Sequence, residues 1–169
     1  YYLLVAWLPA VYADLGAPPD RAAAFFAVFN AATLPAILGF PILSDRLGSR
    51  RLPGAVAAAA FTVGSAGFVV APLASGLAWL WPALAGAGVA GLFALGLVLP
   101  ADIAPSGRVG AAAGEVLAVG DLRAAAAPVL GGAVRDLSGS FAAAMLVLPA
   151  IGLAALALSA ALPEPGGRT

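Results

Sequence analysis

Long apolar runs alternate along the chain with short polar or glycine- and proline-rich breaks. The runs are continuous in Ala, Leu, Val and Gly, which favours helices over the alternating strands of a membrane barrel. A helix needs about 20 apolar residues to cross a bilayer, so the pattern predicts an all-α bundle of six transmembrane helices. The expected helices cover residues 1–13, 21–43, 53–71, 77–101, 109–134 and 140–162, and residues 163–169 form a polar cytoplasmic tail.

The composition excludes several classes of protein. Of 169 residues, 63% are hydrophobic and 9% are charged, and the mean hydropathy is +1.04. An ordinary soluble domain carries about 25% charged residues, so a soluble globular enzyme and a disordered chain are excluded. The formal net charge is zero, and the absence of a basic patch excludes a nucleic-acid binder. The expected surroundings are a lipid bilayer.

Cysteine and histidine are both absent from the sequence. This excludes disulfides, thiolate nucleophiles, zinc sites built from the usual ligands and histidine acid–base chemistry. A phosphate-binding loop of the Gly-x-x-x-x-Gly-Lys-Ser/Thr type is also missing. We therefore expect no enzyme activity, no metal and no cofactor.

The arginines predict the orientation in the membrane. Five lie in loops or the tail on one side and two lie on the other side, and the richer side is cytoplasmic by the positive-inside rule. Both ends of the chain are then cytoplasmic. Arg as the sole basic residue, with abundant Ala, Gly and Pro, suggests a bacterial membrane protein, and the start without Met suggests a fragment of a longer chain. The two groups are Arg46, Arg50, Arg51, Arg108 and Arg168 against Arg21 and Arg135.

A faint internal repeat relates segments 21–43 and 109–134. Each contains a proline and then a glycine and is followed by an Asp/Arg pair beside Gly and Ser, while the two segments run in opposite directions across the membrane. Two inverted three-helix units are typical of transporter halves, although chance similarity between short turns also explains the match. Pro35, Pro128 and Pro149 are expected sites of helix kinks.

The break after segment 21–43 concentrates charge at one end of the bundle. A carboxylate, a glycine turn and a basic cluster predict a compact hinge whose contacts form in one conformation and break in another. The alternative is a static positive-inside anchor. Asp45 is expected either to pair with a nearby arginine or to lie against the N-terminus of a neighbouring helix. The candidate latch residues are Asp45, Arg46, Gly48, Arg50 and Arg51.

This stretch resembles the signature loop of the major facilitator superfamily, which joins the second and third helices of a six-helix half. The matching residues are Leu43-Ser44-Asp45-Arg46, Gly48 and Arg50-Arg51, with Pro41 standing where the family usually has Gly and Ser49 where it often has Arg. Further segments resemble the second half of the branch that includes the cyanate and nitroimidazole transporters. These are Ala6-Trp7-Leu8-Pro9, Trp79-Leu80-Trp81, Gly91-Leu92-Phe93, Pro128-Val129-Leu130-Gly131-Gly132 and Asp136-Leu137-Ser138-Gly139-Ser140.

The resemblance implies that the chain is the C-terminal half of a twelve-helix carrier. Such carriers hold a small solute between their halves near the middle of the membrane and move it by alternating access, as secondary transporters. The missing N-terminal half, or a second copy of this chain, is then an expected partner. The alternative function is a membrane scaffold or sensor built on a half that no longer transports.

Segment 109–134 contains three ionisable residues, Glu115, Asp121 and Arg123. One such group at bilayer depth costs about 2.5–3.5 kcal/mol. On a helix Asp121 and Arg123 lie about 200° apart, and Glu115 and Arg123 lie about 12 Å apart along the axis, so none pairs with another locally. We expect Arg123 to bind a small anionic solute and Glu115 or Asp121 to carry a coupling proton. Structural ion pairs between helices are the alternative.

Four more residues are candidates for the solute path: Asn30, Trp7, Tyr2 and Phe93. The resemblance implies that the first and fourth helices of each half line this path. Asn30 equally suits a hydrogen bond between helices, and aromatic residues near helix ends often lie at the membrane interface.

Overall fold

The computed structural model describes residues 1–73, 76–105 and 107–162, and this part of the chain folds into helices joined by short turns. Five apolar spans within it are long enough to cross a membrane, when Phe141–Ala160 is counted as one span, and Tyr2–Asp14 is a shorter apolar helix. The helices are α1 Tyr2–Asp14, α2 Pro19–Leu47, α3 Arg51–Val70, α4 Leu80–Ile103, α5 Val109–Ser138, α6 Phe141–Met145 and α7 Val147–Ala160. The expected tail 163–169 lies outside the described residues.

The longest helices, α2 and α5, run past the polar residues at which the sequence analysis ends segments 21–43 and 109–134. In α2 the charged residues after position 43 form the last helical turn. The helix stops at Gly48, whose φ of 59° and ψ of 24° are left-handed. Glycine adopts this conformation without the steric cost that other residues incur. The end of α2 is therefore set by the backbone of Gly48 and not by the charged residues that precede it.

The expected last helix, 140–162, is interrupted at Leu146 and divides into α6 and α7. Pro149 follows the interruption by three residues and has no N–H to donate to the carbonyl of Met145. The helical hydrogen-bond pattern is therefore broken where the sequence predicts a kink. Pro35 and Pro128 lie inside α2 and α5, where each removes one backbone hydrogen bond in the same way.

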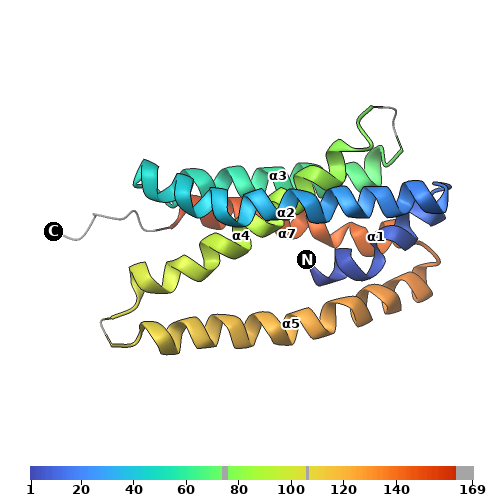
Figure 1. The fold of residues 1–169 in the computed structure, drawn as a ribbon. Coiled ribbons are helices and arrows are strands. Elements are labelled where there is room, and N and C mark those ends of the chain that lie inside the picture. The colour runs from blue at the N-terminus through green and yellow to red at the C-terminus, as the bar shows by residue number, and fades with distance from the viewer. Residues whose placement is uncertain (74–75, 106, 163–169) are drawn as a thin grey trace.

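Helices α2, α3, α4 and α7 pack side by side, and α1 lies against them from the side of α5 (Figure 1). Small residues allow the backbones of α3 and α4 to approach closely. A Cβ atom at Gly88 of α4 would lie 2.6 Å from the carbonyl oxygen of Ala57 in α3, which leaves no room for any other residue. Close packing through small residues is typical of membrane helices.

Helix α5 runs along one side of the other helices and differs from them in its burial (Figure 1). Gly131 is its single buried residue, whereas α3 and α4 each bury many side chains. Its contacts with the bundle concentrate near its C-terminal end, where it meets α1 and α6. The N-terminal half of α5 therefore has a largely uncovered surface.

Candidate functional site

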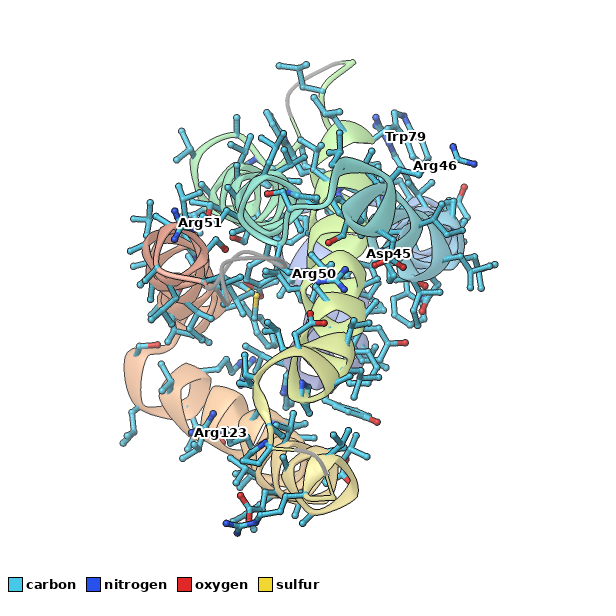
Figure 2. All side chains as sticks on the ribbon, turned by 90° about the vertical axis from the view of Figure 1, so that its left-hand side faces the viewer. Asp45, Arg46, Arg50, Arg51, Trp79 and Arg123 are labelled. Atoms are coloured by element: carbon cyan, nitrogen blue, oxygen red, sulfur yellow. The ribbon has the colours of Figure 1, made fainter. Side chains whose placement is uncertain are left out.

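Arg50 lies at the centre of a charged cluster where α2 ends and α3 begins. Its Nε donates to Oδ2 of Asp102 at 2.8 Å, and its Nη1 donates to Oδ1 of Asp45 at 2.6 Å. Nη1 also donates to Oγ of Ser44 at 2.8 Å. Figure 2 looks at this end of the bundle and shows Arg50 and Asp45 pointing toward each other beside α4. The cluster thus joins α2, α3 and α4.

Burial makes the two ion pairs of Arg50 unequal. The Arg50 side chain is 9% exposed, that of Asp102 is 27% exposed and that of Asp45 is 66% exposed. The hydrogen bond to Asp102 is the largest cause that raises the pKa of Arg50, the bond to Asp45 raises it further, and burial opposes both. Arg50 is therefore charged at every physiological pH, and Asp102 is its more shielded partner.

The other predicted latch residues have different positions. Arg46 is exposed in the last turn of α2, and in Figure 2 it points away from Arg50. Arg51 donates from Nε to the carbonyl oxygen of Leu162 at 2.7 Å, which ties the start of α3 to the residues after α7. Gly48 provides the left-handed turn that brings Arg50 back toward Asp45.

Asp102 is the residue of this cluster that the sequence analysis does not name. It lies in the last turn of α4, not in a loop, and pairs with an arginine 52 positions earlier. The available signal is weak: a lone carboxylate follows an apolar helix on the same side of the membrane as the arginine-rich loop.

The three ionisable residues that the sequence analysis singles out in α5, Glu115, Asp121 and Arg123, are all exposed. No side-chain hydrogen bond or ion pair joins Glu115, Asp121 or Arg123 to any residue in the described part of the chain. Figure 2 shows Arg123 on α5, apart from the Arg50 cluster. These three charges are therefore left without a partner by the described part of the bundle.

Among the described residues, no hydrogen bond joins the remaining candidates for the solute path to Arg123. Asn30 donates its side-chain amide to the carbonyl of Phe26 at 3.0 Å, within α2. Tyr2 is 52% exposed and Phe93 is 54% exposed, so both side chains are accessible in this chain.

An open apolar groove of about 360 Å³ runs between α2 and α4. It is lined by Ala32, Pro35, Ala36, Gly39, Phe40, Leu43 and Ala87.

Trp7 has a partner within the bundle. Its indole Nε1 donates to the carbonyl oxygen of Pro128 at 2.9 Å, and its ring lies 5.5 Å from that of Phe141 between centroids. The polar group of Trp7 is therefore engaged between α1 and α5.

No group of three or more His, Cys, Asp or Glu side chains that could hold a metal occurs among the described residues.

Two curated transporters are similar to this chain. The cyanate transport protein CynX of Escherichia coli (strain K12) is 30% identical over 145 residues, which cover 83% of this chain and 36% of that protein. The 2-nitroimidazole transporter of the same organism is 29% identical over 163 residues, which cover 96% of this chain and 39% of that protein. The chain thus spans little more than a third of the length of these relatives. No family model and no solved structure matches it.

Proposed function

Because the chain is homologous to transporters of the cyanate and nitroimidazole branch of the major facilitator superfamily, we propose that it forms one six-helix half of a secondary transporter. Its partner is the N-terminal half of the same carrier or a second copy of this chain. The solute is a small organic or inorganic anion, bound between the two halves and moved by alternating access. The carrier resides in a bacterial inner membrane, with both ends of this chain in the cytoplasm.

The observation that carries this proposal is the uncovered charge on α5. Arg123 is exposed on a 30-residue membrane-length helix and has no partner in the described part of the chain. A guanidinium facing lipid tails is costly, so Arg123 faces water, a solute or another protein surface. Its planar fork matches a carboxylate or a cyanate-like anion. Asn30, Tyr2, Trp7 and Phe93 are further proposed residues of the solute path.

The acids of α5 supply the coupling. Glu115 and Asp121 lie on the same helix as Arg123, are exposed as it is, and also lack partners among the described residues. One of the two acids then takes up a proton on one side of the membrane and releases it on the other side, as the anion moves.

The Arg50 cluster acts as the latch of this cycle. It joins the ends of α2 and α4 to the start of α3 through hydrogen bonds of 2.6 to 2.8 Å. Ion pairs at such a junction form and break as whole units, which makes them suitable for holding one of two conformations. Arg50 stays charged throughout, so it is available to its partners whenever the helices bring them together.

Transport by the intact protein tests the proposal. We would reconstitute it into proteoliposomes and measure uptake of labelled cyanate, formate, nitrite and 2-nitroimidazole, with and without a proton gradient. The proposal predicts that at least one of the three anions accumulates above its external concentration, and that a protonophore abolishes this accumulation. A correctly inserted protein that takes up none of the three anions would contradict it and favour a scaffold or sensor.

A further inference from the structure

Helices α1 and α5 meet at one close contact. Trp7 of α1 donates its indole N–H to the carbonyl oxygen of Pro128 in α5, 121 residues later in the sequence. The ring lies against a stretch of α5 without side chains: a Cβ atom at Gly132 would lie 3.1 Å from Cζ2 of Trp7. The neighbouring Gly131 is the one residue of α5 that is buried. The contact between Trp7 and α5 therefore depends on the indole and on the missing side chain of Gly132, while Gly131 leaves room for Leu3.

Pro128 is also the weak point of α5. Proline has no N–H, so the helical hydrogen bond to the carbonyl of Ala124 is missing, and its ring crowds the preceding turn. Helices bend at such positions. The carbonyl oxygen of Pro128 has two lone pairs. It can therefore accept the indole N–H of Trp7 in addition to a backbone N–H of the helix. Trp7 thus holds the peptide that directly follows the weak turn.

The segment before Pro128 has little else to fix its direction. Between positions 110 and 126 most residues are exposed, and those that are partly covered are alanines. Arg123 lies five residues before Pro128, about 7.5 Å along the helix axis. Its position in space is therefore set by the angle that α5 adopts at the Trp7 contact and by the connection to α4.

We infer that Trp7 is a positioning residue, which fixes the angle of α5 at Pro128 and so places Arg123 for solute binding. The inference rests on the proposed function of Arg123 as an anion ligand. In this role Trp7 acts through the backbone of α5, by its hydrogen bond to Pro128, and not through contact with the solute. The N–H group, and not the bulk of the ring alone, carries this role.

The variant Trp7→Phe tests this role because it keeps an aromatic ring but removes the donor. A matched control is Trp81→Phe, since Trp81 also donates its indole N–H to a backbone carbonyl, that of Ala71 at 2.8 Å, but lies between α4 and the end of α3. The chain contains no cysteine, so spin labels can be attached to cysteines introduced at the exposed positions Leu117 in α5 and Val63 in α3. Both variants are made in the intact protein.

We expect Trp7→Phe to broaden the distribution of distances between the labels at least about twofold, while Trp81→Phe keeps the width of the parent. Loss of one hydrogen bond loosens Arg123, so the KM for uptake of labelled cyanate, formate or nitrite, whichever the parent transports, should rise about fivefold at nearly unchanged kcat. Gly132→Ala should shift both quantities in the same direction with Trp7 intact, because its methyl group would lie 3.1 Å from Cζ2 of Trp7 and would push the indole away from Pro128.

Three results would overturn the inference. A parental distance distribution in both Trp7→Phe and Gly132→Ala would show that α5 is held elsewhere. A broadened distribution of label distances with an unchanged KM for uptake would show that Trp7 stabilises α5 without placing Arg123 for solute binding. Equal effects of Trp7→Phe and Trp81→Phe would show a general loss of packing. Failure of the proposed function is seen separately, as a parent protein that transports none of the three anions.

Discussion

Nε of Arg50 donates to Oδ2 of Asp102 at 2.8 Å, a bond that joins the start of α3 to the last turn of α4. The Arg50 side chain is 9% exposed, so water competes little for this hydrogen bond. The second carboxylate, Asp45, reaches the same guanidinium from α2 at 2.6 Å but is 66% exposed. One buried cation therefore holds three helices together at this end of the bundle.

The two carboxylates should differ in their contribution to stability. Asp102→Asn leaves a buried guanidinium with one neutral and one water-exposed partner, and we expect a loss of about 1.5–3 kcal/mol. Asp45→Asn should cost less than about 1 kcal/mol, because its charge is screened by solvent. Thermal unfolding of the intact protein in detergent, followed by tryptophan fluorescence, measures both. A larger loss for Asp45→Asn would contradict the assignment of Asp102 as the main partner.

Close packing of α3 and α4 predicts a second, steric effect. Gly88→Ala places a methyl group 2.6 Å from the carbonyl oxygen of Ala57, so the backbones must separate. We expect a loss of about 1–3 kcal/mol in the same unfolding assay. Gly96→Ala is the matched control on the same helix, since no atom lies within 4 Å of its added Cβ. Equal stability of the two variants would contradict the close packing of these helices.

Proton coupling predicts a split between two kinds of transport. If one acid of α5 carries the proton, Asp121→Asn or Glu115→Gln abolishes accumulation driven by a proton gradient but leaves exchange of internal for external anion intact. The reason is that exchange needs the anion site and the conformational change, but no net proton movement. Uptake and counterflow in the same proteoliposomes measure the two activities. Full accumulation in both variants would exclude both acids as proton carriers.

The fold could be predicted to the extent that it depends on local signals. The apolar runs predict the helices because about 20 apolar residues suffice to span a bilayer, whatever they contact. Helix ends depend on backbone conformation. The charged residues before Gly48 therefore predict an end of α2 at residue 43, one turn before the observed end at Leu47. Pro149 predicts an interruption in the last helix. Helix α6 ends at Met145 because the carbonyl of this residue, four positions before the proline, receives no helical hydrogen bond from it.

The site could be predicted only in part, because its contacts are distant in sequence. Arg46, Arg50 and Arg51 are equivalent in the pattern, yet Arg50 alone of the three is buried. Its partner Asp102 is 52 positions away, and the acceptor of Trp7 is 121 positions away. No local spacing encodes such pairs. By contrast, the sequence predicts the lack of local partners for Arg123, because helical geometry alone separates it from Asp121 and Glu115.

Uptake by the Arg123→Ala variant of the intact protein tests the central claim most directly. With insertion into the membrane unchanged, we predict that uptake of the anion that the parent transports falls about 100-fold or more, because truncation removes the charged hydrogen bonds to the solute. Arg21→Ala, which removes an exposed arginine at the start of α2, serves as the control and should transport like the parent. Parental uptake by Arg123→Ala would contradict the account and assign Arg123 to structure.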